Sequence, residues 1–532
     1  MNFTSTQIPY SETEKFSQIV LDYISGDAEL RPFYKHLPNI SGIENAIKER
    51  QKFPTNRKLL VEHLNNQYKG VAISPLVKNN IDSLINENVF TVCTAHQPNI
   101  LTGHLYFIYK IVHAIKLASF LNSKFIEYKF VPVFYVGSED ADIDELGTIS
   151  IDGKIYKWNT SQTGAVGRMK VDKALVDLID EVSNQVEVLP HGEGIMKIIK
   201  GAYKLDEPIE RATLKLVNEL FGEYGLIILL PDNPDLKRSF SPVIKKELLS
   251  QFSNKSVSET LKIFPEKYKV QTHGREINLF YLKDDLRERI EKEGDEYKIA
   301  NSELKFSKEE MNSEVQLHPE RFSPNVILRP VFQEWILPDV AFIGGGGELA
   351  YWFELKSVFE ETNVPVPVLI LRNSYLFIAK KEVEKILKLN FTNIDIFRDI
   401  QSLNNELVSR LSENAIDVDT ELQKIKEVYE TLTYKAETID STLKKHCLAL
   451  LKWNEDKIIS LQKKMLRAEK KKYEIHLRLI SDLKNKLFPQ GILQERVDNL
   501  IYFYSLYGDE FIKTVYENAL DLEFEFVIVE EK

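Results

Sequence analysis

Two neighbouring carboxylates, Glu139 and Asp140, stand shortly after a nearly uninterrupted apolar run at 130–137. Such a run is typical of a parallel strand that is covered on both faces. In an open α/β sheet, residues beyond the carboxyl ends of the strands face the ligand crevice. Carboxylates there can orient a substrate amine, hold Mg²⁺ together with phosphates, or act as a general base. We therefore predict that both are catalytic. Helix capping, which we favour for the later acids at 142–145, is the alternative.

A second cluster lies in the loop between an apolar run at 89–94 and a helix expected over 105–121. The loop, HQPNILTGH, places a Gly-His pair at the helix start, where unpaired amides and the helix dipole favour a phosphate. The pair resembles the signature of class I aminoacyl-tRNA synthetases and related nucleotidyltransferases, in which it touches ATP. An ordinary tight loop with a capping histidine is the alternative. We predict a catalytic His104 and, as residues that bind substrate or nucleotide, His96, Gln97, Thr102, Gly103, Tyr106 and Lys110.

A run of four glycines precedes another expected helix. Glycines let the backbone approach a ligand closely, and their amides can then cradle an anion, although a hinge or a tight chain crossing would also use them. Arginines in the same region suit phosphates or carboxylates because the guanidinium binds them bidentately. Pairing with the chain's surplus acids is the alternative for them. The binding residues predicted here are Arg329, Gly344, Gly345, Gly346, Gly347, Glu348, Tyr351, Arg372 and Asn373.

The sequence also indicates which strands and helices position these residues. Apolar runs that alternate with helical segments are typical of a doubly wound parallel sheet. The runs lie at 89–94, 130–137, 225–230 and 364–372. The first ninety residues show helical spacing and are expected to form a packed helical lead-in. Two charge-rich stretches, about 151–215 and about 255–320, are predicted to be inserted segments that form a smaller subdomain.

The C-terminal third differs because residues 368–488 contain neither proline nor glycine, which favours long helices. Apolar side chains between 422 and 453 follow the 3-4 spacing of a coiled-coil seam. The spacing resumes at 458–468 after a one-position shift, as at a stutter. We predict one helix of roughly 70 residues, about 100 Å long, that pairs with a partner. A further helix after Pro489 and a strand in EFEFVIVE complete the chain.

The composition excludes several classes of protein. With 532 residues the chain exceeds the size of a single hydrophobic core. Its net charge of −11 argues against a nucleic-acid or anionic-membrane partner, because both need clustered positive charge. Two cysteines allow no disulfide framework and fit the reducing cytoplasm. No signal peptide, membrane span or metal-ligand spacing is recognisable, so we expect a cytoplasmic protein without a tightly bound metal.

Five ordered motifs resemble the cysteine ligase family of bacillithiol biosynthesis: TAHQPNILTGHLYFIYKIVHAIKLA, VPVFYVGSEDADIDEL, YGLIILLPDNPDLKR, SPNVILRPVFQEWILPDVAFIGGGGELAYW and VPVPVLILRNS. The resemblance spans roughly residues 1 to 530. It implies an α/β protein with a Rossmann-like, class I synthetase-like parallel-sheet core, inserted connecting segments and a C-terminal α-helical coiled-coil domain. The expected bounds are 1–150, 216–254 and 321–375 for the core, 151–215 and 255–320 for the connecting segments, 376–488 for the coiled coil, and 489–532 for a C-terminal helix and strand.

The resemblance also implies a reaction, in which the carboxyl group of L-cysteine is joined to the glucosamine amine of glucosaminyl-malate. Amide formation from a free carboxylate is uphill in water, so we expect activation by ATP with Mg²⁺. The implied assembly is a homodimer formed through the coiled coil. Two alternatives stay open: another synthetase-like nucleotidyltransferase or ligase, and a non-catalytic coiled-coil scaffold.

The hypothesis assigns a role to each cluster. The nucleotide phosphates lie between the helix start at Gly103 and His104 and the glycine loop at 344–347, with His104 and Arg372 supporting the transferred charge. Either Glu139 or its neighbour holds or deprotonates the acceptor amine, and Arg329 meets a malate carboxylate.

Overall fold

The computed structural model describes residues 3–272, 274–412 and 417–532, which fold into two compact units. The first comprises residues 15–376 and 492–529 together with the segment that ends at Ser11. The second comprises Phe377–Gly491 with the short segments Glu12–Glu14 and Glu530–Lys532. The second unit therefore largely coincides with the stretch that lacks proline and glycine.

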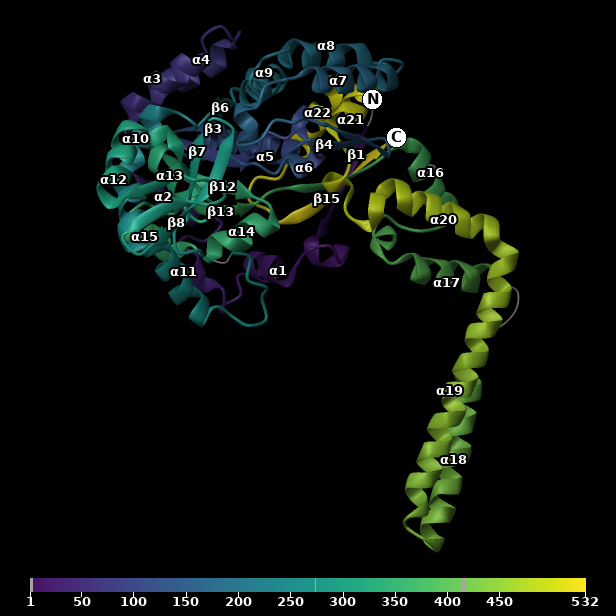
Figure 1. The fold of residues 1–532 in the computed structure, drawn as a ribbon. Helices are drawn as coiled ribbons and strands as arrows, with labels where there is room; N and C mark the ends of the chain where they lie inside the picture. Colours follow the sequence, from purple (N-terminus) through teal and green to yellow (C-terminus); the bar gives the residue numbers. More distant parts are fainter. Residues whose placement is uncertain (1–2, 273, 413–416) are drawn as a thin grey trace. The chain divides into compact units, whose positions relative to one another are not determined.

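A five-stranded parallel sheet lies at the centre of the first unit (Figure 1). Its spatial order is β13 (Val368–Leu371), β12 (Asp339–Gly344), β2 (Val89–His96), β3 (Lys129–Val136) and β6 (Ile227–Leu229). The α/β class with a parallel sheet is confirmed. The sequence did not reveal β12, because its short apolar run merges into the glycines. From β2 the chain adds strands first on one side and then on the other, so the topological switch point lies between β2 and β12.

Helices pack on this sheet and complete its core. Helix α5 (Leu105–Lys124) connects β2 to β3 and packs on both, while α2 (Ile40–Arg50) packs on β12 and β13. Their shared cluster includes Ile43, Phe90 and Leu117. The remaining helices of the core are α1 (Gln18–Ser25), α3 (Arg57–Gln67), α4 (Pro75–Ser83), α6 (Ile143–Leu146), α10 (Pro234–Ser250), α11 (Phe252–Ile263), α13 (Arg329–Ile336), α14 (Gly346–Phe353) and α15 (Lys356–Thr362).

The chain begins and ends in a second, smaller sheet. Its order is β1 (Phe3–Pro9), β15 (Glu525–Glu531) and β14 (Ser374–Ile378). The expected helical lead-in therefore contains helices α1 to α4 but opens with a strand. The predicted C-terminal strand is present as β15, and two helices precede it, α21 (Leu500–Tyr507) and α22 (Asp509–Glu517).

The two predicted inserts have different structures. The first holds the hairpin β4 (Thr148–Ile151) and β5 (Lys154–Lys157) and the helices α7 (Lys173–Val186), α8 (Gly192–Ala202) and α9 (Ile209–Phe221). The second forms an antiparallel sheet that β11 extends, in the order β10 (Lys305–Ser307), β9 (Glu296–Ile299), β8 (Leu286–Glu293), β7 (Leu279–Lys283) and β11 (Phe322–Pro324), with α12 (Lys308–Leu317) beside it.

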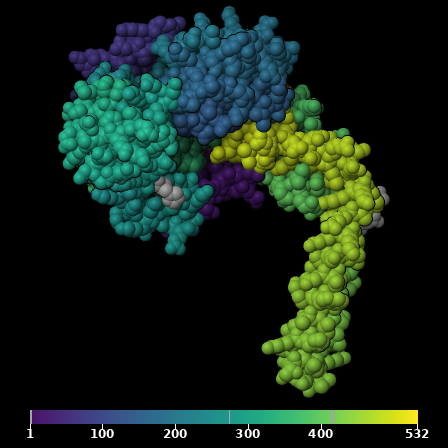
Figure 2. Space-filling model, in the orientation of Figure 1, coloured from purple at the N-terminus to yellow at the C-terminus, as the bar shows by residue number. Residues whose placement is uncertain are grey.

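The second unit is helical and carries a long hairpin. Its helices are α16 (Lys380–Lys388), α17 (Ile400–Leu411), α18 (Asp419–Ile439), α19 (Leu443–Lys470) and α20 (Glu474–Leu487). Helices α18 and α19 lie side by side and form a slender rod (Figures 1 and 2). We call this pair the arm. Contacts of Lys426 with Glu455 and of Lys444 with Glu437 show that the two helices are antiparallel.

The prediction of one helix of roughly 70 residues is therefore wrong. The chain turns at Asp440, whose Oδ1 accepts hydrogen bonds from the amide and the hydroxyl of Thr442, both 2.8 Å long. Such a side-chain bond to the backbone offers an alternative to helix continuation. The longer arm helix, α19, has 28 residues and spans about 42 Å. The two helices pack against each other within one chain, but apolar side chains of the predicted seam such as Leu432 and Trp453 remain exposed. No described helix is long and apolar enough to cross a membrane.

Candidate functional site

A cavity of about 600 Å³ opens at the carboxyl ends of the parallel strands in the first unit. Every strand of the sheet contributes residues at or just beyond its carboxyl end: His96 and Gln97 at β2, Ser138 to Asp140 after β3, Pro231 after β6, the glycine loop after β12 and Arg372 after β13. This is the position at which open α/β sheets bind ligands, next to the switch point between β2 and β12.

Most of the predicted site residues line this cavity. They are His96, Gln97, Tyr106, Lys110, Glu139, Asp140, Arg329, Gly345, Gly346, Gly347, Glu348, Tyr351 and Arg372. Five others are not among its lining residues: Thr102, Gly103, His104, Gly344 and Asn373. Asn373 is buried and hydrogen-bonds to His113 and Leu520. The predicted residues that line the cavity therefore lie together in one place, while the role of each residue stays a prediction.

His104 is the N-cap residue of α5, makes no side-chain capping hydrogen bond and is not among the lining residues of the cavity. Its Nδ1 lies 3.1 Å from the carbonyl oxygen of Val497, and the amide of Leu105 donates to the carbonyl of Asp498 over 2.8 Å. The preceding loop is also held by this segment, because the side-chain amide group of Asn499 donates to the backbone carbonyls of Leu101 and Gly103. The C-terminal segment thus covers the helix start. Neither Gly103 nor His104 is among the lining residues of the cavity, and the phosphate contact and the catalytic role stay predictions.

The glycine loop closes on itself through Glu348. Its carboxylate accepts from the amide of Gly345 over 2.8 Å and pairs with the buried ammonium of Lys110. Burial raises the pKa of Glu348, but Lys110 and this amide outweigh burial and leave the pKa below its usual value. Gly346 packs against Val20, where a Cβ would come within 2.7 Å of a methyl group, whereas a Cβ on Gly347 would meet no atom within 4 Å. Space for a ligand therefore remains at Gly347.

His96 is an uncharged group of the cavity wall. Burial, assisted by the charge of Lys110, lowers the pKa of His96 to about 3. Its Nε2 lies 3.3 Å from the hydroxyl of Tyr106. At neutral pH the imidazole can therefore orient a ligand by hydrogen bonds but carries no charge.

Glu139 belongs to a buried charged network. Its carboxylate pairs with the ammonium of Lys237, which also lies 2.9 Å from Asp232, and Asp232 in turn pairs with Arg168 over 2.6 Å. Burial raises the pKa of Glu139, and Lys237 opposes this rise. Asp140 accepts a 3.1 Å hydrogen bond from Gln97. The network gives Glu139 a fixed position at the cavity, where a carboxylate can accept a proton from a bound amine.

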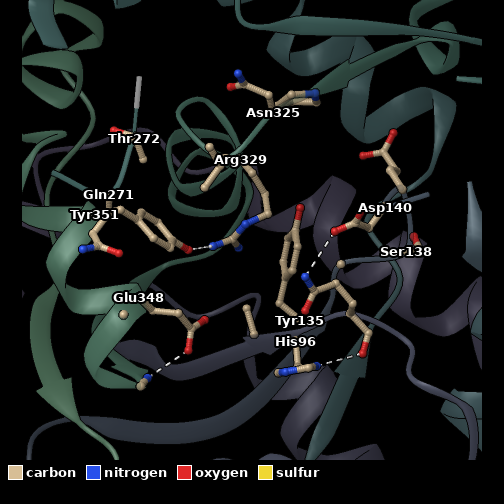
Figure 3. A pocket seen from close by; sticks show the side chains of 18 of the residues that line it. His96, Tyr135, Ser138, Asp140, Gln271, Thr272, Asn325, Arg329, Glu348 and Tyr351 are labelled. Carbon is tan, nitrogen blue, oxygen red and sulfur yellow. Dashed lines mark hydrogen bonds between the residues drawn. The ribbon is translucent and has the colours of Figure 1, made fainter. Parts of the chain in front are cut away.

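The predicted arginines differ in how their charge is balanced. Arg372 is buried and pairs with Glu495 over 2.6 Å, so for this residue the alternative of pairing with an acid is correct. Among the described residues, Arg329 donates hydrogen bonds to two neutral oxygens, the hydroxyl of Tyr351 at 2.9 Å and the side-chain carbonyl of Gln333 at 3.1 Å. Figure 3 shows its guanidinium between the rings of Tyr351 and Tyr135. Its positive charge is therefore available for an anionic ligand.

Sequence reasoning missed one side of the cavity. Its residues come from the second insert and from the segments that flank it: Gln271, Thr272, Arg275, Phe280, Arg287, Asn325 and Val326. Tyr135, Ser138 and Arg496 also line the cavity without having been predicted, as do Ala95, Gly137, Pro231 and Pro324. The lining residues between Gln271 and Arg287 belong to no motif, because the insert reaches the cavity only through its tertiary packing. Within the described ranges, no three His, Cys, Asp or Glu side chains are grouped as metal ligands.

Comparison with known proteins gives the family. The model of the N-terminal Rossmann-like domain of bacillithiol biosynthesis BshC matches residues 1–373. The chain belongs to the BshC family. The model of the BshC C-terminal coiled-coil domain matches residues 375–531, so both parts of the predicted architecture are confirmed.

Three curated relatives match along nearly the whole chain, and each is named "Putative cysteine ligase BshC". The relative from Flavobacterium johnsoniae is 38% identical over 98% of this chain and 99% of its own length. Those from Flavobacterium psychrophilum and Christiangramia forsetii are 39% and 38% identical, each over 98% of both chains. The resemblance inferred from the five motifs is therefore confirmed.

Proposed function

We propose that this BshC protein is a cytoplasmic cysteine ligase that joins L-cysteine to the amine of glucosaminyl-malate and so forms bacillithiol. Family membership and the name of its relatives support a ligase. The observation that carries the proposal is the charge pattern of the cavity. Its carboxylates Glu139 and Asp140 share one space with Arg329, which forms no ion pair with a carboxylate in the part of the chain that the structure describes. A substrate that bears both an amine and carboxylates matches this pattern.

The proposed chemistry needs an activated cysteine carboxyl group. ATP with Mg²⁺ would supply that activation, and the loop at Gly347 offers backbone that a phosphate can approach closely. Glu139 accepts the proton of the acceptor ammonium, and the free amine then attacks the activated carboxyl carbon. The new C–N bond forms as the bond to the activating group breaks. Arg329 holds a carboxylate of the acceptor during this step.

A product assay tests the function. Purified protein is incubated with L-cysteine, glucosaminyl-malate, ATP and Mg²⁺, and a parallel sample lacks ATP. We expect mass spectrometry to find bacillithiol only in the complete mixture, together with AMP or ADP. Bacillithiol in both samples would contradict the ATP requirement. If folded protein forms no bacillithiol but couples cysteine to another amine from a substrate panel, that amine and not glucosaminyl-malate is the acceptor.

We further propose that the arm mediates a homodimer. None of the α18 side chains is buried, and apolar side chains of the arm remain open, with 46% of Leu432 and 58% of Trp453 exposed. Exposed apolar surface of this kind is typical of an interface. A second copy of the arm would bury it.

Removal of the arm should therefore give a monomer. Because the arm is a hairpin, residues 419–470 can be replaced by a short Gly-Ser linker without displacing its neighbours. We expect light scattering to show a monomer for this variant and a dimer for the full chain. The double variant Leu432→Lys and Trp453→Lys, which keeps the hairpin, should behave in the same way. A dimer in both variants would place the interface elsewhere, and turnover by the monomer would contradict the scaffold alternative.

A further inference from the structure

The second insert brings an unpaired arginine into the cavity. Arg287 lies on β8, and its guanidinium carbon stands 3.8 Å above the ring centroid of Phe280 on β7. Both residues line the cavity. A guanidinium that stacks on an aromatic face keeps its planar N–H fork free for an acceptor. The strand pair therefore holds Arg287 in place without using its hydrogen-bond donors.

At least one of those donors has no acceptor among the described residues. The buried Nε of Arg287 lacks a hydrogen-bond partner, and no carboxylate within the described ranges forms an ion pair with this side chain. Leaving a buried donor of a charged group unsatisfied costs free energy, which a bound anion would recover. Burial lowers the pKa of Arg287, while the nearby charges of Asp140 and Glu139 oppose this effect. Arg275, a second arginine of the cavity wall, lies on the same side.

The positions of the carboxylates and of Arg287 would orient a bound ligand. The carboxylates Glu139 and Asp140 follow β3, and Arg287 lies near enough to feel their charge without pairing with them. A ligand that places an ammonium group on these carboxylates would therefore direct an acidic substituent toward Arg287. Arg329 provides one further cation in the same cavity. Two separate cations suit a ligand that has two carboxylates.

We infer that Arg287 forms a second anion subsite on the inserted sheet, which binds one carboxylate of a dicarboxylate-bearing amine while Arg329 binds the other. The inference rests on the proposed function and deepens it. The acceptor lies on the side of the insert, and the glycine loop is left to the nucleotide and the amino acid that is activated. Discrimination between an acceptor with a dicarboxylate group and a neutral one then depends on Arg287.

Calorimetric binding to full-length protein tests the subsite. The two probes are glucosaminyl-malate and methyl glucosaminide, which has the same amine but no carboxylate. We expect Arg287→Gln to weaken glucosaminyl-malate binding about 10- to 100-fold, as for the loss of a charge-assisted hydrogen bond, and to leave methyl glucosaminide unaffected. Arg287→Lys keeps the charge without the fork and should give an intermediate affinity.

The control is Arg289→Gln, two residues further along β8. Arg289 is 43% exposed, lies 3.7 Å from Glu291 and does not line the cavity, so both affinities should remain unchanged. Melting curves of both variants check that the fold is intact. Equal weakening of both probes by Arg287→Gln, or of neither, would overturn the subsite.

Failure of the proposed reaction and failure of the proposed Arg287 subsite can be told apart. If no bacillithiol forms but glucosaminyl-malate binds the wild type and not Arg287→Gln, the subsite stands and the reaction is wrong. If bacillithiol forms and Arg287→Gln leaves the KM for glucosaminyl-malate unchanged, the reaction stands and the subsite is wrong.

Discussion

Replacement of Glu139 by alanine is expected to reduce cysteine coupling by about 10²- to 10⁴-fold, the usual contribution of a general base. The fold should survive, because Lys237 keeps its 2.9 Å contact with Asp232 when its second carboxylate is removed. Burial raises the pKa of Glu139. The wild-type rate should therefore fall as the pH drops through this raised pKa, since the protonated acid cannot accept the ammonium proton. Single-turnover coupling at several pH values measures both effects.

Two further variants show whether charge is the cause. Glu139→Gln keeps the size of the side chain but cannot accept a proton, so it should lose as much activity as the alanine variant. Asp142→Ala removes an exposed carboxylate of the same acidic run, which caps α6 through a 3.1 Å bond from the amide of Glu145 and does not line the cavity. It should retain full activity. A glutamine variant as active as wild type would exclude Glu139 as the base.

The strands flanking the acidic run were predictable because they are long apolar runs that end in polar loops. The runs at 89–94 and 130–137 correspond to β2 and β3, and the rule for open sheets then placed Glu139 and Asp140 at the ligand crevice. β12 was not predictable in the same way. It has six residues and passes directly into glycines, so no periodic signal separates strand from loop.

Contacts between distant parts of the chain explain what the sequence did not show. The Gly-His pair at the start of α5 suggested an open phosphate site, but Val497 and Asp498, almost four hundred residues away, supply the atoms that cover it. Arg287 carried no motif, because its placement depends on how an inserted sheet packs beside the core. Local sequence predicts local elements better than it predicts such contacts.

The arm shows a limit of the 3-4 pattern itself. Its apolar spacing predicts that the segment pairs with another helix, and α18 and α19 do pack against each other. The same spacing fits a partner on another chain or a return of the same chain. Whether the partner is another chain or the same chain depends on a three-residue turn at Asp440, Ser441 and Thr442. These residue types favour turns and caps, so the turn could have been predicted from the sequence.

Replacement of Arg50 by methionine is expected to destabilise the first unit by about 3–5 kcal/mol, the usual cost of leaving one member of a buried ion pair alone. Arg50 lies on α2 and is 2% exposed. Its guanidinium pairs with Glu334 over 2.5 Å and donates to the carbonyls of Glu334, Leu337, Asp339 and Pro365. These contacts join α2 to the start of β12 and to α13. Urea unfolding followed by tryptophan fluorescence measures the loss.

The pH dependence of this loss identifies its cause. Burial raises the pKa of Glu334 to about 7 and that of Asp339 well above its usual value, while Arg50 opposes both rises. A carboxyl group with a raised folded pKa contributes stability that is present at low pH and is lost as the pH rises through that pKa. Without Arg50 both acids become harder to ionise, so the deficit relative to wild type should be larger at pH 8 than at pH 5.5.

Arg57→Met is the matched control for this dependence. The Arg57 side chain is also partly buried, but it donates to the backbone carbonyls of Leu84, Glu87 and Val89 and pairs with no carboxylate within the described ranges. Its loss should cost stability by a similar amount at both pH values, because no carboxyl group is left with an uncompensated charge. An Arg50→Met deficit that is equally independent of pH would mean that lost hydrogen bonds, and not unpaired buried carboxylates, account for the destabilisation.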